Sequence, residues 1–169
     1  MKTIILLAMH GSPPNDFPKP ELAEFFGLKA RLESGGGMKN EAVEERYNLL
    51  NEKISSWPRT AQNDPFWAGS HQLAENLNKA TSMQVLVAFN DFCSPSLEQG
   101  LEKAISLGAE KVIVITTMMT KGGEHSEIEI PQAIQKVQKQ HPQIKIIFAW
   151  PFEPSEVALF LAQQIRRFV

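Results

Sequence analysis

Short apolar runs and helical stripes alternate along most of the chain. Four runs rich in Ile, Val, Leu or Phe occupy residues 3–9, 84–89, 111–117 and 144–150, and three of them show little polar alternation. Runs of this kind are typical of strands that are covered on both faces. Because strands that alternate with helices favour an α/β fold, the sequence predicts a doubly wound, four-stranded parallel sheet with helices on both faces.

Apolar side chains at helical spacing predict the helices that connect and follow these strands. In chain order the stripes contain Leu73 and Leu77; Leu97, Leu101, Ala104 and Ile105; Ile130, Ile134 and Val137; and Val157, Phe160, Leu161, Ile165 and Phe168. Ser94 is the expected N-cap of the second helix, with Pro95 as its first helical residue. Pro154 is expected where the chain enters the last helix.

Residues 13–66 interrupt this rhythm. They hold two helical patterns of their own, at 20–33 and 41–56, which a glycine-rich stretch at 34–37 separates. We interpret this segment as a helical insertion within a single domain of residues 1–169. It would lie between the first strand and its crossover helix, expected at 68–80. A lid, a dimer surface and a packing scaffold are all open as its role.

Composition excludes several classes of function. The chain has 169 residues, is 43% hydrophobic and carries a net charge of −2 without any block rich in Lys or Arg, so neither nucleic-acid binding nor membrane binding is expected. The apolar start at residues 4–9 is too short to cross a bilayer and fits a buried strand better. One cysteine, Cys93, rules out an internal disulfide, and we expect a cytoplasmic protein.

The residues best suited to bind a ligand or transfer a proton lie at the ends of the predicted strands. The first strand runs into His10, the second into Asp91, and the third into a loop that ends at His125. In an open parallel sheet, ligands bind beyond the carboxyl ends of the strands, where the strand order reverses. If the order is 2-1-3-4, as in flavodoxin-like sheets, strands one and three are neighbours and His10 and His125 approach each other from adjacent loops.

Two histidines and a carboxylate can hold a divalent ion while leaving coordination positions open. A neutral imidazole can also accept a proton near physiological pH. The alternative is a purely structural role, in which His10 and His125 are loop residues whose ring nitrogens form hydrogen bonds with the backbone. Both interpretations stay open at this point, although the neighbouring glycines would allow the close backbone approach that a binding site needs.

The other candidates have simpler explanations. His71 and His141 are expected to be structural or solvated, and Cys93 to be a small buried hydrophobe. Glu127 and Glu129 suit the first turn of a helix, and either of them could instead hydrogen-bond a metal-bound imidazole.

A phosphate-binding loop is not indicated. Two prolines follow Ser12 where backbone N–H donors would be needed, and no glycine-rich nucleotide motif follows any strand. No nucleotide or flavin cofactor is expected.

Three segments carry a resemblance to a known family: the first strand with His10-Gly11-Ser12, residues 87–92 (VAFNDF) with Pro95, and residues 108–114 (GAEKVIV) continuing through 122–131 (GGEHSEIEIP). The chain resembles the class II tetrapyrrole chelatases, and among them the small sirohydrochlorin cobaltochelatases and ferrochelatases. The resemblance covers residues 1–12 and about 67–169. The segment between them is not part of the usual short form.

The resemblance implies a lyase that inserts a divalent metal, Co²⁺ or Fe²⁺ with Ni²⁺ also open, into sirohydrochlorin with release of two protons. The pathway would be cobalamin or sirohaem biosynthesis. His10 and His125 would be the catalytic metal ligands, with His10 also the proton acceptor. Substrate contacts are implied for Asp91, Thr120, Lys121, Gly122, Gly123 and Glu124. A homodimer is expected, because short family members pair to complete a cleft.

This chain departs from the family pattern at two places. Asp91 stands where glutamate is common, and Met118-Met119-Thr120 replaces a Pro-x-Phe-Leu run. Lys121 is the best-placed basic group for the carboxylates of the substrate, and three arginines of the insertion are further candidates: Arg31, Arg46 and Arg59. Two alternatives to catalysis are a metal or tetrapyrrole carrier and a flavodoxin-like binding module with incidental histidines.

Overall fold

A computed structural model describes residues 1–34 and 40–169 of the chain. Its elements are β1 (Thr3–Met9), α1 (Lys19–Glu33), α2 (Glu41–Ser55), α3 (Pro65–Thr81), β2 (Gln84–Phe89), α4 (Leu97–Ser106), β3 (Lys111–Thr116), the π-helical turn η1 (His125–Glu129), α5 (Ile130–Gln140), β4 (Lys145–Phe148) and α6 (Pro154–Ile165). The glycines expected between the first two helices, at 35–37, lie outside the described residues.

The four strands form one parallel sheet in the order β2-β1-β3-β4. This arrangement confirms the fold class and the strand order predicted from the sequence. Because β1 pairs with both β2 and β3, the loops that follow these three strands leave the same edge of the sheet side by side. The strand order therefore brings the ends of β1, β2 and β3 together.

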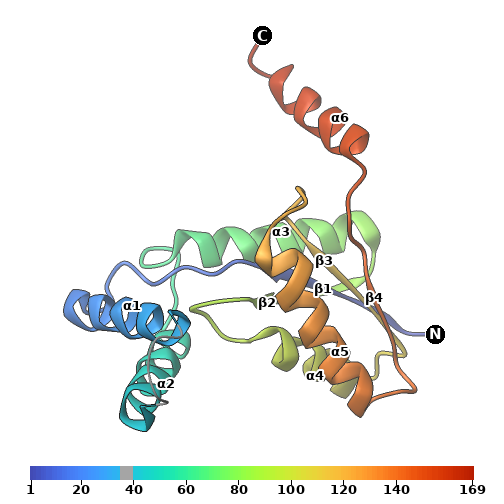
Figure 1. Cartoon of the computed structure of the whole chain (residues 1–169). Coiled ribbons are helices and arrows are strands. Elements are labelled where there is room, and N and C mark those ends of the chain that lie inside the picture. Colours follow the sequence, from blue (N-terminus) through green and yellow to red (C-terminus); the bar gives the residue numbers. More distant parts are fainter. Residues whose placement is uncertain (35–39) are drawn as a thin grey trace.

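Helices cover both faces of the sheet, as predicted (Figure 1). Alternate residues of β1 face opposite layers, because successive side chains of a strand point to opposite sides. Ile4, Leu6 and Ala8 pack with α4 and α5, whereas Leu7 and Met9 pack with α3. Burial on both faces explains why β1 reads as an unbroken apolar run.

The start of α4 differs from the prediction. Ser96 is the N-cap: its hydroxyl accepts a hydrogen bond from the backbone N–H of Gln99, and the Gln99 side chain accepts one from the N–H of Ser96. The expectation of Ser94 as N-cap and Pro95 as first helical residue is wrong. The carbonyl of Pro95 accepts the N–H of Phe89 at 2.9 Å, which keeps this stretch beside the end of β2 instead of in the helix.

The helices of the 13–66 segment form a small unit with its own core. Phe17, Phe25, Leu50 and Ile54 are buried together, and Phe92 from the loop after β2 packs against them. Both predicted helices occur within one residue of their expected bounds. The crossover helix α3 begins at Pro65, three residues earlier than predicted, because Asp64 caps it by accepting the N–H of Trp67.

The last helix, α6, leads away from the sheet (Figure 1). None of its residues is buried, and Leu159, Phe160, Leu161 and Ile165 are each more than half exposed. The fourth strand is also shorter than predicted, ending at Phe148. No helix in the described part of the chain is both long and apolar enough to cross a membrane.

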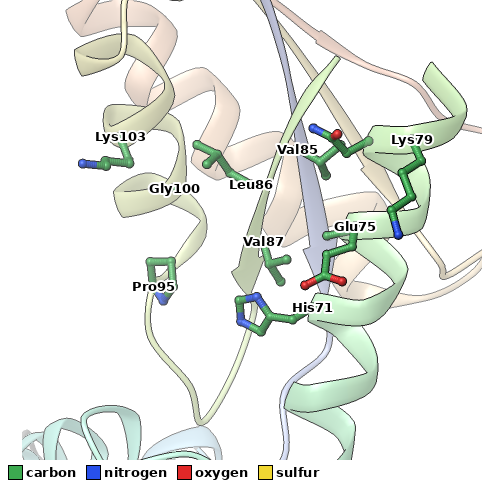
Figure 2. A pocket seen from close by; sticks show the side chains of 11 residues that line it. His71, Glu75, Lys79, Val85, Leu86, Val87, Pro95, Gly100 and Lys103 are labelled. Atoms are coloured by element: carbon green, nitrogen blue, oxygen red, sulfur yellow. The ribbon is translucent and has the colours of Figure 1, made fainter. Parts of the chain in front are cut away.

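A hollow of about 530 Å³ runs along β2, which is an edge strand and has no neighbour on that side. Figure 2 shows it between α3, which supplies His71, Glu75 and Lys79, and α4, which supplies Lys103. The strand itself contributes Val85–Val87 to the floor. This groove follows from the open edge of the sheet, and none of its lining residues belongs to the histidine cluster described next.

Candidate metal centre

His10, Asp91 and His125 converge at the carboxyl edge of the sheet. Each residue offers one ligand atom, and these three atoms all lie within 4.8 Å of one another. Asp91 Oδ2 is 3.7 Å from His10 Nδ1 and 3.3 Å from His125 Nε2, and the two imidazole rings meet edge to face at 4.5 Å between centroids. The residues follow β1, β2 and the β3 loop respectively, so the strand order alone accounts for their meeting.

The spacing of these atoms suits a shared cation. Two atoms that bind one metal at about 2.1 Å in tetrahedral geometry lie about 3.4 Å apart. The pair formed by Asp91 Oδ2 and His125 Nε2 has this separation. His10 Nδ1 is slightly farther from Asp91 Oδ2, at 3.7 Å.

The hydrogen bonding of His125 strengthens this conclusion. Its Nδ1 lies 2.6 Å from a carboxylate oxygen of Glu129, so the neutral ring carries its proton on Nδ1 and donates it there. The Nε2 lone pair is then aimed at the Asp91 carboxylate. Two electron-rich atoms 3.3 Å apart repel each other unless a positive charge lies between or upon them, which a divalent cation provides.

The turn that begins with His125 sets this partnership. In η1 the N–H of Ile130 bonds to the carbonyl of His125, five residues back, so the turn is wider than in an α-helix. Pro131 follows and lacks the N–H that a regular α-helical turn would use at that position. Residues four apart in a helical turn share one face, so the Glu129 carboxylate reaches His125, and the side-chain amide of Asn90 also reaches Glu129 at 3.4 Å.

Glu129 therefore orients the imidazole of His125, and we expect Glu129→Gln to weaken Co²⁺ or Zn²⁺ binding about 10- to 100-fold. A neutral amide no longer polarises the Nδ1 proton, and it can also offer its NH₂ group and so favour the wrong tautomer. Isothermal titration of the metal measures the effect. Glu127→Gln is the matched control, because the Glu127 carboxylate accepts the backbone N–H of Gly122 instead of contacting a histidine. Equal losses in both variants would contradict the role of Glu129.

Gly11 allows the first two loops to touch. It has a φ of +149°, and a Cβ atom placed on it would lie 1.7 Å from the carbonyl oxygen of Asp91. Only glycine fits a backbone approach this close. The residue thereby fixes how near His10 can come to Asp91.

We expect Gly11→Ala to lower metal affinity by at least tenfold and to destabilise the fold by about 2 kcal/mol or more, because one loop must move away from the other. Metal titration and thermal unfolding check the two effects. Gly27→Ala is a suitable control, since a Cβ there has no neighbour within 4 Å. Wild-type metal affinity in Gly11→Ala would show that this contact does not set the site.

The cluster is open on the His10 side. The side chain of His10 is 50% exposed, against 21% for His125 and 23% for Asp91. Five of the six residues for which the sequence predicted substrate contact form an exposed loop before His125: Thr120, Lys121, Gly122, Gly123 and Glu124. A large planar ligand can thus approach His10 from solvent.

Two of the three arginines named as possible basic groups at the rim of the cleft, Arg46 and Arg59, pair with carboxylates of the 13–66 segment. Arg59 is 5% exposed and pairs with the buried Asp64, so it does not face a ligand and that prediction is wrong. Arg46 forms a two-fold pair with Glu24 on the outer surface of α1 and α2. Lys121 is exposed in the loop before His125 and is the candidate that the geometry keeps.

The remaining predictions are simpler to place. The His71 ring packs at a tilt against Trp67, with 4.5 Å between centroids, and His141 pairs with Glu102 at 3.0 Å, so a structural role accounts for both. Cys93 is buried, and burial raises the pKa of its thiol to about 11, which fits an unreactive apolar side chain. Sequence reasoning did not anticipate that one oxygen of Asp91 lies close to both imidazoles, although its place directly after β2 was a usable signal.

Comparison with known proteins gives the family. The CbiX family model matches residues 64–167, which is more than half of the chain. The chain belongs to the CbiX family. The match covers α3 to α6 and includes Asp91 and His125, whereas β1 with His10 and the helices α1 and α2 lie outside it. The chelatase family that the sequence resembles is thereby confirmed.

Two curated relatives of this CbiX protein come from Priestia megaterium. One is a sirohydrochlorin ferrochelatase, 33% identical over 70 residues, which are 41% of this chain and 26% of the relative. The other is a sirohydrochlorin cobaltochelatase, 33% identical over 78 residues, 46% of this chain and 25% of the relative. The matched stretch therefore spans about a quarter of the length of each relative.

A solved structure supports the fold over nearly the whole chain. A CbiX protein from Marinobacter aquaeolei VT8 superposes with a TM-score of 0.56 and 16% identity, covering 98% of this chain and 95% of that one. At this identity the likeness concerns the fold. It shows that an architecture of this kind extends through the N-terminal part, beyond the residues that the family model matches.

Proposed function

We propose that this CbiX protein is a sirohydrochlorin-type chelatase, a lyase that inserts Co²⁺ or Fe²⁺ into a tetrapyrrole with release of two protons. The observation that carries the proposal is the convergence of His10, Asp91 and His125 within 4.8 Å at an open edge of the sheet. The names of the two Priestia megaterium relatives support the substrate and the metals.

The roles of the residues follow from their exposure. His125 and Asp91 are the less exposed ligands and hold the metal substrate, and Glu129 keeps the Nε2 lone pair of His125 available. The more exposed His10 meets the macrocycle first. As the ion passes to the ring nitrogens, two pyrrole N–H bonds break and their protons leave, and the imidazole of His10 accepts one of them.

The loop 120–124 would contact the macrocycle from the side of β3. Lys121 offers a positive charge to the substrate carboxylates, and the backbone there bends sharply at Gly122, which has a φ of +94°. Asp91 Oδ2 lies 3.7 Å from His10 Nδ1 and 3.3 Å from His125 Nε2, close enough to bind the same ion without a bridging water. We therefore assign it to the metal as well as to the substrate.

The metal is proposed as Co²⁺ or Fe²⁺, and Ni²⁺ is open on the same chemistry. Two imidazoles and one carboxylate suit all three ions, and their ligand preferences alone do not select among them. The cobalamin and sirohaem pathways are both open for the product. We propose a cytoplasmic location, where an unpaired cysteine such as Cys93 is ordinary.

Multiple turnover is the test that separates a chelatase from a carrier. Sirohydrochlorin and Co²⁺, or Fe²⁺ under anaerobic conditions, are mixed with a sub-stoichiometric amount of protein, and the product is followed by absorbance. We expect more than ten equivalents per chain at a rate well above the spontaneous insertion. Product limited to one equivalent per chain would favour the carrier, and no acceleration at all would contradict both.

We also propose that the chain forms a homodimer through α6. Two apolar surfaces stay partly exposed in the described part of the chain: the side chains of α6, none of which is buried, and the half-buried Ile113 and Ile147 on the face of β3 and β4 opposite α5. Exchange of α6 between two copies covers both surfaces at once, in the reciprocal manner of a two-fold dimer. The occupant we assign to this sheet face is therefore the α6 helix of a second copy.

The 13–66 segment is proposed as an insertion within the single domain of residues 1–169. The family model begins to match at residue 64, directly after α2 and its following loop. The segment has its own buried core and contacts the loops that carry His10 and Asp91. Of the roles that the sequence left open, these contacts favour a scaffold for the site.

A further inference from the structure

The buried side chain of Arg59 contacts four separate parts of the chain. Its Nη1 donates to the carbonyl of Ser12 at 2.6 Å and to the Asp64 carboxylate at 2.5 Å. Its Nη2 donates to the carbonyl of Ile54 at 2.8 Å and to that of Phe92. The guanidinium thus joins the end of α2 and the start of α3 to the loops after β1 and β2.

Two of these carbonyls belong to the site loops. Ser12 is two residues beyond His10, and Phe92 directly follows Asp91. The planar fork of a guanidinium holds two acceptors in fixed directions, which a flexible ammonium group does not. A single side chain therefore sets the separation of the loops that bear the first and second metal ligands.

Further contacts make this arrangement specific. Phe92 has a φ of +57°, a conformation that a bulky residue keeps only where its surroundings require it. Its ring packs against Phe25 and Phe26 of α1. The side chains of Arg59 and Asp64 are 5% and 2% exposed, so water cannot replace these bonds.

We propose that Arg59 is a positioning residue for the metal centre, acting through the carbonyls of Ser12 and Phe92. It belongs to the 13–66 segment, so this segment contributes to metal binding without supplying a ligand. The inference rests on the proposed metal site, and it adds a residue that neither a metal-ligand pattern nor an exposed cleft would reveal.

The test is a Co²⁺ titration followed by calorimetry and by the visible absorption of the bound ion, which reports coordination geometry. For Arg59→Lys, which keeps the charge beside Asp64 but loses the fork, we expect at least tenfold weaker binding and an altered spectrum. Asp64→Asn breaks the ion pair but leaves the two carbonyl contacts. We expect it to lower the Tm while changing Co²⁺ affinity by less than about twofold, with the wild-type spectrum.

Arg46→Lys is the matched control within the same segment, because the Arg46 guanidinium forms a two-fold pair with Glu24 on the surface. If Arg59→Lys does not fold, the double variant Arg59→Gln with Asp64→Asn replaces the ion pair by a neutral pair of similar shape. We expect this double variant to bind Co²⁺ at least tenfold more weakly than the wild type, whereas Asp64→Asn alone does not. Wild-type affinity and spectrum in Arg59→Lys or in the double variant would overturn the inference.

The two levels of failure are distinguishable. If the wild-type protein binds no Co²⁺, or if His10→Ala and His125→Ala bind it as tightly as the wild type, the proposed metal site is wrong. If the histidine variants lose Co²⁺ binding and the Arg59 variants keep it, the proposed metal site is supported and only the positioning role of Arg59 is wrong.

Discussion

His125→Ala is expected to weaken Co²⁺ binding by about 100-fold or more and to reduce chelation to near the spontaneous rate. The variant removes the ligand whose Nε2 faces Asp91 at 3.3 Å, and it leaves the Glu129 carboxylate without its imidazole partner. His10→Ala should also abolish turnover, but with a smaller loss of metal affinity, because His10 is more exposed and lies farther from Asp91. Metal titration and steady-state chelation assays measure the two effects separately.

The matched control for this pair is His141→Ala. His141 is also partly exposed and also pairs with a carboxylate, that of Glu102, but it lies at the end of α5 away from the cluster. We expect its metal affinity and turnover to equal those of the wild type. If His10→Ala and His125→Ala keep the metal affinity and turnover of His141→Ala, the two histidines are incidental. A flavodoxin-like binding module is then the better interpretation.

The second large effect is expected at α6. The double variant Leu161→Glu with Ile165→Glu should convert a dimer into monomers, because it places charges on the apolar face of the helix. Each buried Leu or Ile side chain contributes about 2 kcal/mol, and a symmetric dimer loses four of them, so the dissociation constant should rise by roughly six orders of magnitude. Light scattering after size exclusion should give about twice the 18.9 kDa of one chain for the wild type and one chain for the variant.

Gln163→Glu is the control for α6, because it adds a charge to the same helix at a polar position. It should leave the dimer intact. A wild-type protein that is monomeric, with α6 folded onto its own sheet, would contradict the exchange. A variant that stays dimeric would place the interface elsewhere.

The histidine cluster shows what sequence reasoning can reach. An apolar run covered on both faces identifies each strand, the order 2-1-3-4 makes β1 and β3 neighbours, and His10 and His125 follow from their places at the strand ends. The convergence of the two rings at 4.5 Å was therefore accessible from the pattern. Their joint binding of a cation is a proposal that rests on this geometry.

Other features depended on contacts that a pattern does not contain. Glu129, and not Glu127, bonds to His125 because His125 opens a helical turn in which residues four apart share a face, and the sequence pattern left the start of that turn open. The buried Arg59 bonds to carbonyls that lie 33 and 47 residues away in the chain. The sequence shows only a charged residue in a polar stretch, so its burial could not be predicted. The stripe of α6 predicted a helix correctly, but periodicity does not say which surface the helix covers.

The central claim is that His10, Asp91 and His125 share one cation, and anomalous diffraction from crystals grown with Co²⁺ tests it most directly. We predict a single strong peak at the cobalt edge about 2.1 Å from an imidazole nitrogen of each histidine and from a carboxylate oxygen of Asp91. A stoichiometric cobalt ion bound elsewhere, with the three side chains left uncoordinated, would contradict the account.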